Sequence, residues 1–258
     1  MFGFVAPLAG SADGQGANDD ESASDEITIK LPKAQKTVVY GIAIAGGLGT
    51  YLLLGQLVGG GMGMPRFEAA QVGNLELAWL IPLALVGTAC GWLYFVSGHA
   101  SEALAHAIGE RPVVKAMLAG LALAICGTVL PYTMFAGETQ ADVLMETYMT
   151  IPAGVLIATG LIKAMLTAAL INLGWRGGHF FPVIFSGVSL GYGLAVLTGA
   201  DPVFCVAVCT ASTMGAVMRQ PVMVVGLLLM CFPLKGIVCM IIAAVIAAGI
   251  PLPKPLRK

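Results

Sequence analysis

Four long apolar runs constrain the fold of this chain more than any other feature of its sequence. They cover Thr37–Gly63, Leu77–Val96, Val113–Phe135 and Ile151–Leu173. Each run reaches the roughly 20 residues that an α-helix needs to cross a bilayer. A backbone that crosses lipid must satisfy its own hydrogen bonds, and a helix does so within one segment. The runs therefore predict an all-α integral membrane protein.

The composition agrees with a membrane protein and argues against several other classes. Hydrophobic residues make up 58% of the 258 residues and charged residues 10%, whereas roughly a quarter of a soluble domain is charged. The net charge of −1 gives no indication of a nucleic-acid partner. Cys205 and Cys209 share a helix face, but two thiols without further ligands make a poor metal site. With no nucleophile–base pair in the sequence either, we expect neither an enzyme nor a metal or organic cofactor.

The apolar segments become shorter in the last third of the chain. Val183–Thr198, Val203–Met218, Pro221–Phe232 and Ile237–Ile250 are too short for a full crossing without tilt or partners. Short hydrophobic segments interrupted by glycine and proline are typical of transporters built from discontinuous helices. We therefore expect broken, tilted membrane helices in this region.

Ser97–Glu110 predicts a separate amphipathic helix at the inner membrane surface. His99 and His106 lie seven residues apart in this segment and share one helix face. They form either a metal or proton site or a histidine pair that is satisfied at the membrane interface.

The two ends of the chain differ from its apolar centre. Residues 1–10 are interpreted as the remnant of a preceding apolar helix, 11–36 as an acidic disordered linker, 37–253 as the transmembrane domain and 254–258 as a basic tail. The linker is rich in Gly, Ser and Asp, and so cannot bury a core; an acidic interaction tail is the alternative. Basic residues favour the cytoplasmic side of a membrane. Lys30, Lys33, Lys36 and the tail therefore predict a cytoplasmic linker and C-terminus.

The stretch Gly174–Gly187, GWRGGHFFPVIFSG, contains the strongest candidate site. Glycine tolerates close approach and positive φ, and proline suits the first turn of a helix. We therefore expect one helix to end at Gly177–Gly178 and the next to begin at Pro182. A helix start carries unpaired N–H groups and a partial positive charge. Such a start predicts an anion site, with water or a neighbouring carbonyl as the alternative partner.

These residues resemble a known family. GGHFFP fits the GxFxP signature of the CLC family of chloride channels and chloride–proton antiporters, with Gly178, Phe180 and Pro182 at the fixed positions. The segments LIKAMLTAALINLGWRGGHFFPVIFSGVSLGYGLA and FCVAVCTASTMGAVMRQPVMVVGLLL are similar to the helices that surround this signature. The resemblance extends from about Thr37 to Pro255.

The resemblance implies two inverted repeats, with chloride held near mid-membrane by helix N-termini. The backbone N–H groups of His179 and Phe180 would face the ion, and Gly177, Gly178 and Pro182 would shape the turn. Lys163 either faces the anion path or pairs with a carbonyl. Arg176 draws anions to the inner entrance or is simply an inside-facing charge, and we expect Arg219 to be structural. The resemblance also implies a homodimer in the cell membrane, acting as a voltage-gated channel or an antiporter.

The chain departs from the family pattern in several places. The GSGIP loop, whose serine touches the ion in the family, and the GREGP loop, whose glutamate gates it, do not occur in the sequence. GERP at Gly109–Pro112 lies in a charged loop instead. Arg257 stands where a tyrosine of the family contacts the ion. Phe4–Gly10 resembles the end of the first repeat, so the chain resembles a second repeat plus a remnant.

We therefore expect transport of chloride or a similar small anion by a partial CLC-type protein, and little or no flux from this polypeptide alone. Two alternatives stay open. One is a truncated, non-transporting membrane protein or dimerising partner. The other is a different broken-helix carrier that shares only the glycine-rich turn.

Overall fold

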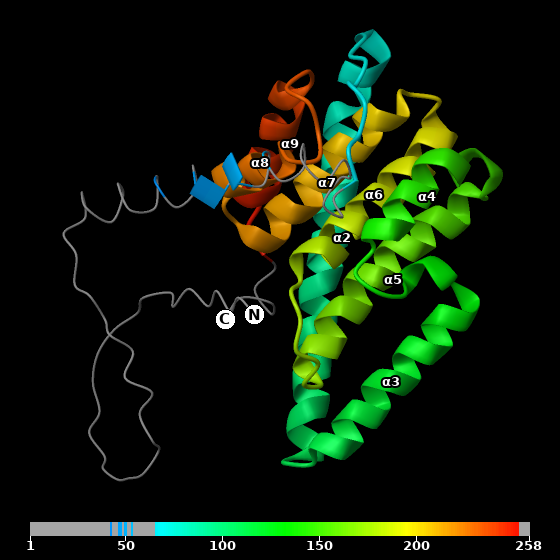
Figure 1. Ribbon diagram of the computed structural model, residues 1–258, viewed down its shortest axis with the longest axis vertical. Helices are drawn as coiled ribbons and strands as arrows, with labels where there is room; N and C mark the ends of the chain where they lie inside the picture. The colour runs from blue at the N-terminus through cyan, green and yellow to red at the C-terminus, as the bar shows by residue number, and fades with distance from the viewer. Residues whose placement is uncertain (1–41, 43–45, 48, 51–52, 54–64, 253–258) are drawn as a thin grey trace. The chain divides into compact units, whose positions relative to one another are not determined.

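The computed structural model describes residues 65–252 and, before them, residues 42, 46, 47, 49, 50 and 53. The predicted segments 1–10, 11–36 and 254–258 lie outside the described residues, as does almost all of Thr37–Gly63. Residues 65–252 belong to one compact unit. All regular secondary structure in the described part of the chain is helical (Figure 1), which confirms the predicted all-α fold.

The helices of this unit follow one another with short connections. Their bounds are α2 Asn74–Ile108, α3 Pro112–Val129, η1 Pro131–Thr133, α4 Glu138–Thr147, η2 Tyr148–Thr150, α5 Ala153–Asn172, α6 Phe180–Thr198, α7 Pro202–Met218, α8 Pro221–Leu228 and α9 Ile237–Gly249.

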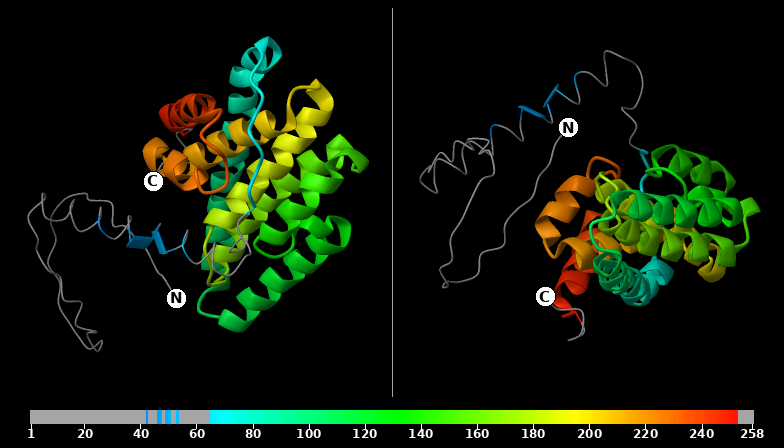
Figure 2. Two further views of the ribbon diagram at one scale, coloured as in Figure 1. Left: turned by 45° about the horizontal axis from the view of Figure 1, so that its top comes forward. Right: turned by 90° about the horizontal axis from the view of Figure 1, so that it is seen from below.

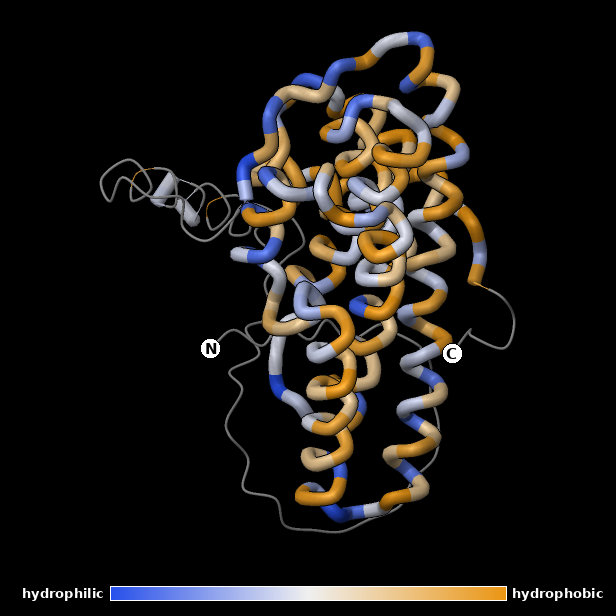
Figure 3. Tube along the Cα trace, turned by 90° about the vertical axis from the view of Figure 1, so that its right-hand side faces the viewer, coloured by the Kyte–Doolittle hydropathy of each residue, from blue (hydrophilic) through white to orange (hydrophobic). Residues whose placement is uncertain are grey.

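Four of the described helices, α2, α3, α5 and α6, are long and apolar enough to cross a membrane. The helices α7 and α9 are apolar but shorter, as expected for broken segments. Hydrophobic residues run along the helices, while the lowest and uppermost turns of the unit are hydrophilic (Figure 3). This distribution matches a bundle whose middle lies in lipid and whose ends meet water.

The predicted division between Leu77–Val96 and a separate surface helix Ser97–Glu110 is wrong. Leu77–Val96 and the second segment as far as Ile108 belong to one 35-residue helix, α2. Buried polar groups in its second half have hydrogen-bond partners, whereas His106 is exposed. The hydroxyl of Ser101 donates to the carbonyl of Ser97 (2.7 Å), and the side-chain amide of Asn172 on α5 donates to the carbonyl of Gly98 (2.7 Å). A polar stretch therefore continues the helix here because its neighbours bind it.

The third apolar run is also shorter as a helix than its hydropathy indicates. The prediction was Val113–Phe135, but α3 ends at Val129 and Pro131 opens a short 3-10 turn. A proline disfavours helical backbone in the residue before it, which explains the break at Leu130. The break leaves Pro131–Gly137 as a non-α connection between α3 and α4.

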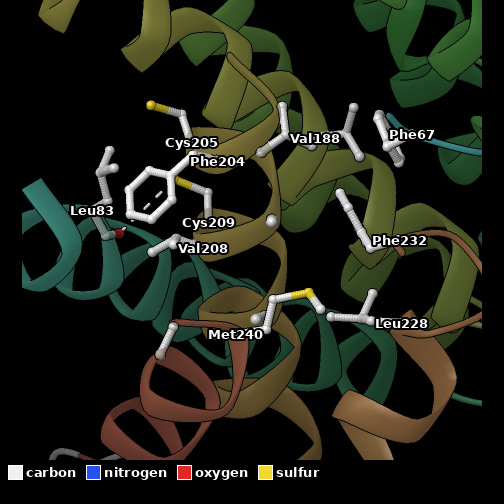
Figure 4. Packing of buried hydrophobic residues seen from close by; sticks show 14 of the residues in the cluster. Phe67, Leu83, Val188, Phe204, Cys205, Val208, Cys209, Leu228, Phe232 and Met240 are labelled. Atoms are coloured by element: carbon white, nitrogen blue, oxygen red, sulfur yellow. Dashed lines mark hydrogen bonds between the residues drawn. The ribbon is translucent and has the colours of Figure 1, made fainter. Parts of the chain in front are cut away.

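The core of the unit forms around α6 and α7, which pack against α2, α5 and α9 (Figure 1, Figure 2). The thiol of Cys209 on α7 lies 3.9 Å from the carbonyl oxygen of Leu83 on α2 (Figure 4). The rings of Phe67 and Phe232 stack with centroids 4.5 Å apart. The helix α7 lies in the interior of this core, where Phe204 is 1% exposed.

Small residues on α6 allow its backbone to approach that of α7. A Cβ added to Gly187 would lie 2.5 Å from Cα of Thr210, and one added to Gly191 would lie 2.5 Å from Cα of Val206. Glycine at helix contacts is a recurrent means of close packing in membranes. The α6–α7 contact therefore depends on missing side chains, and it fixes the helix whose start carries the candidate site.

A carboxylate joins the starts of α2 and α7. The N–H of Gly73 donates to Oε2 of Glu76 (2.9 Å), and the N–H of Asp201 donates to Oε1 of the same side chain (3.2 Å). Asp201 itself caps α7 by accepting from the N–H of Phe204 (2.7 Å). Glu76 thus satisfies two backbone donors that the helices leave unpaired.

We expect Glu76→Ala to lower the stability of the chain, because two backbone N–H groups at helix starts lose their acceptor. The unfolding temperature of the purified chain in detergent measures the effect. Glu68→Ala is the matched control, since Glu68 is an exposed carboxylate close by in the sequence. Equal unfolding temperatures for the two variants would contradict the role of Glu76 as a shared cap.

Candidate functional site

The turn between α5 and α6 is closed by Gly174. Its φ of 92° is left-handed, and the N–H of Trp175 donates to the carbonyl of Leu170 (3.0 Å). α5 therefore ends at Asn172, and the predicted end at Gly177–Gly178 is wrong. Gly174 provides the closure because a glycine just after the last helical residue adopts left-handed backbone without steric cost.

The glycine pair has a different part in the turn. Neither Gly177 nor Gly178 has a positive φ, and a Cβ added to either would meet nothing within 4 Å. The pair therefore does not provide positive φ in this turn, and no protein atom packs closely against it. The two glycines instead border open space directly before α6.

α6 begins at Phe180, two residues earlier than the predicted start at Pro182. Proline is tolerated as the third helical residue because the first N–H groups of a helix have no intrahelical acceptor. The first regular bond of the helix runs from the N–H of Val183 to the carbonyl of His179 (3.1 Å). No side chain caps this helix, so the amides of Phe180 and Phe181 form an uncapped helix start.

A cavity of about 360 Å³ lies beside this turn. Its lining is mainly apolar and comes from α3, α5, η1, the loop after η1 and the turn before α6. Four of the six predicted site residues line it together: Lys163, Gly177, Gly178 and Pro182.

The other two predicted site residues do not line the cavity with their side chains. The ring of His179 stacks on that of Phe180 with centroids 4.8 Å apart, and it lies 6.5 Å from the ring of Tyr94 on α2. The two residues could therefore act on an ion only through their backbone N–H groups, as the sequence analysis expects.

Lys163 is 4% exposed on α5 and does not extend toward a membrane surface. Its Nζ donates to the carbonyls of Thr133 (2.6 Å), Met134 (3.4 Å) and Phe135. An ammonium has three N–H donors, and three carbonyls accept here. Of the two alternatives that the sequence leaves open, the structure shows the carbonyl pairing, and it also shows Lys163 at the cavity wall.

Comparison with known sequences and structures identifies the family. The family profile described as voltage gated chloride channel matches residues 26–251. The chain belongs to the voltage-gated chloride channel family. A solved structure described as a CLC-type fluoride/proton antiporter superposes with a TM-score of 0.60 at 20% sequence identity. The match covers 76% of this chain and 49% of the antiporter, so the chain spans about half its length.

The comparisons confirm the predicted family, and the structural match confirms the CLC-type fold. Comparison with curated protein sequences gives no match. A voltage-gated chloride channel fold with four apolar helices of spanning length makes this chain a multi-pass membrane protein. At this level of sequence identity the solved structure establishes the fold alone.

The other two charged residues that were considered for the site have different surroundings. Arg176 is exposed in the turn before α6. Arg219 caps the end of α7 with a φ of 58°, and its Nη1 donates to the carbonyls of Ala248 (3.1 Å) and Ile250 (2.5 Å) at the end of α9. This contact fits the structural role expected for Arg219.

The groups first considered for metal binding have other surroundings in the fold. In α2, Nδ1 of His99 lies 3.0 Å from the carbonyl oxygen of Phe95, and Cys205 and Cys209 are buried in the core. Among residues 65–252 no three His, Cys, Asp or Glu side chains gather in a group that could hold a metal.

The segment Pro131–Gly137, termed the strap, is part of the cavity wall, although no prediction from the sequence included it. Three of its residues, Thr133, Phe135 and Ala136, line the cavity, and three of its carbonyls bind Lys163. Pro131 and Gly137 bracket the segment and mark a non-helical connection. Its pairing with a lysine about 30 residues further along the chain leaves no local signal.

Proposed function

We propose that this chain takes part in the transmembrane transport of chloride or a similar small anion, as a component of a CLC-type channel or antiporter. The observation that carries the proposal is the uncapped start of α6, next to a cavity lined by Gly177, Gly178 and Pro182. Membership of the voltage-gated chloride channel family supports the same class of substrate.

The physical argument begins with the unpaired amides. In a membrane interior each unsatisfied polar group costs several kcal/mol, and a helix start adds a partial positive charge. An anion satisfies both at once. We propose that the N–H groups of His179 and Phe180 bind the ion, while Gly177 and Gly178 leave the room that it occupies.

Backbone dipoles also suit transport better than a formal charge does. A conducting site must bind an ion strongly enough to admit it and weakly enough to release it. The ammonium of Lys163 lies at the same cavity, but three carbonyls accept its hydrogen bonds. Its charge is therefore already balanced by protein dipoles, and the ion would not meet a bare cation.

Family membership supports a proposal for the assembly and orientation of the chain. We propose a homodimer in the cell membrane, with the acidic linker and the C-terminal tail in the cytoplasm. Because the chain spans about half the length of the matched antiporter, anion binding is a more direct test of the site than flux. A chain that binds chloride without transporting it would match the alternative of a non-transporting or dimerising partner.

A backbone ester at Phe180 tests the site directly, because it replaces the N–H with oxygen and keeps the side chain. We expect the affinity for chloride to fall about tenfold or more, since a hydrogen bond to a charged group contributes roughly 1.5–3 kcal/mol. Isothermal titration calorimetry of the purified chain in chloride, with gluconate as the inert anion, measures the change.

An ester at Val222 is the matched control for this experiment. Val222 also lies in the first turn of an apolar helix, directly after Pro221, but it is 86% exposed and outside the cavity. Chloride affinity should be unchanged in this control. An affinity for chloride that survives the Phe180 ester would remove the helix start from the binding site.

A further inference from the structure

The strap has an unusual backbone conformation at the cavity wall. Phe135 has a φ of 57°, although it is a bulky residue for which left-handed backbone is unfavourable, and Gly137 has a φ of 104°. The ring of Phe135 is 76% exposed, so burial of its side chain does not offset the strain. A conformation of this kind persists only where the surrounding structure imposes it.

Lys163 imposes this conformation. The carbonyls of Thr133, Met134 and Phe135 belong to consecutive residues, and all three accept from its Nζ. Consecutive carbonyls of an extended segment point in alternating directions, so they can converge on one ammonium only when the backbone curls. The left-handed turn at Phe135 and the pairing with Lys163 are therefore parts of one arrangement.

The strap is also fitted against the helices on either side of it. A Cβ added to Gly137 would lie 2.5 Å from Cβ of Phe185, on α6 one turn after Pro182. A Cβ added to Gly127 on α3 would lie 2.8 Å from Cγ of Met134. The strap thus contacts α3, α5 and α6, and a shift of the strap would reach the helix that carries the candidate anion site.

We infer that Lys163 is a positioning residue, which holds the strap in place as a wall of the anion cavity and does not itself bind the ion. This inference rests on the proposed anion site at the start of α6. All three donors of the ammonium are used by carbonyls, so an anion that bound Lys163 directly would have to break at least one of these bonds. Lys163 instead fixes the cavity shape through the strap.

The test compares Lys163→Met, which removes the charge and the donors, with Lys163→Arg, which keeps the charge and several donors. Two quantities are measured on the purified full chain: hydrogen exchange of the strap amides by mass spectrometry, and chloride affinity by calorimetry. We expect Lys163→Met to raise strap exchange at least about tenfold and to weaken chloride binding. Lys163→Arg should keep strap exchange and chloride affinity close to those of the unmodified chain. Hydrogen exchange within α7 should be unchanged in both variants, which would show that the fold is intact.

Gly137→Ala disturbs the strap without changing Lys163. If Lys163 acts through the strap, this variant should weaken chloride binding as Lys163→Met does. Weaker binding in Lys163→Met with unchanged strap exchange would overturn the inference and make Lys163 a direct ligand. Faster strap exchange with unchanged affinity would also overturn it.

The Phe180 ester separates these outcomes from a failure of the proposed site. If the ester weakens chloride binding but the strap variants do not, the site stands and the positioning role falls. If the ester and the strap variants all leave the affinity unchanged, the anion site at α6 is wrong, and the role of Lys163 in anion binding falls with it.

Discussion

Replacing Gly178 with valine should reduce chloride affinity at least about 100-fold, or about 2.8 kcal/mol, while the unfolding temperature stays nearly constant. A Cβ at this position meets nothing within 4 Å, and the residue has no positive φ, so the fold accepts a side chain. The new side chain would fill the space beside the start of α6, where we place the ion. Calorimetry and thermal unfolding of the same sample measure the two effects.

Gly226→Val provides the control for this substitution. Gly226 lies in α8, is exposed and also has nothing within 4 Å of an added Cβ, but it does not line the cavity. Chloride affinity should stay at its original value in this variant. If Gly178→Val binds chloride normally while the Phe180 ester does not, the ion approaches the helix start from a side away from Gly178.

Gly191→Leu should prevent the chain from reaching its fold. A Cβ here would lie 2.5 Å from Cα and 2.8 Å from the backbone nitrogen of Val206 on α7. These are backbone atoms of a buried helix, so the clash cannot be relieved by rotating a side chain. Overpacking of a core by added methylenes costs about 1–3 kcal/mol, and a clash with backbone should exceed about 3 kcal/mol.

The yield of monodisperse protein and its unfolding temperature measure this effect, with Gly191→Ala as a milder variant. Gly154→Ala near the start of α5 serves as the control, because Gly154 is exposed and its added Cβ meets nothing. Comparable stability of Gly191→Ala and Gly154→Ala would show that α6 and α7 separate easily. The close backbone contact between α6 and α7 at Gly191 would then contribute little to the stability of the chain.

The sequence predicts α7 almost to the residue and the apolar body of α5, because hydropathy reports directly on helices that must satisfy their backbone inside lipid. The expected end of α5 at Gly177–Gly178 is wrong, because Gly174 closes the helix earlier. The prediction from the sequence is wrong for α2, because the polar second half of this helix has the pattern of a separate surface helix. The side chain that supports this half is Asn172, which comes from another helix. A local pattern does not encode such a contact, so tertiary structure decides the boundary.

The candidate site, too, can be predicted from the sequence only in part. The motif that contains Gly178, Phe180 and Pro182 predicts a site at this turn, because proline suits a helix start and the three residues together fit the family signature. The strap cannot be found in this way. Lys163 lies 28 residues or more from the carbonyls that it binds, and any backbone segment offers carbonyls. Only the folded arrangement reveals which segment the lysine holds.

The exposure of α3 sets it apart from the other long helices. Of its 18 residues 11% are buried, compared with 67% in an apolar stretch of 18 residues in α6. In Figure 1, α3 lies at the edge of the described unit. Most side chains of α3 therefore pack against no other part of the described unit. Over evolutionary time α3 can exchange one aliphatic residue for another with little penalty, and we expect neutral drift to be fastest along it and slowest along α6.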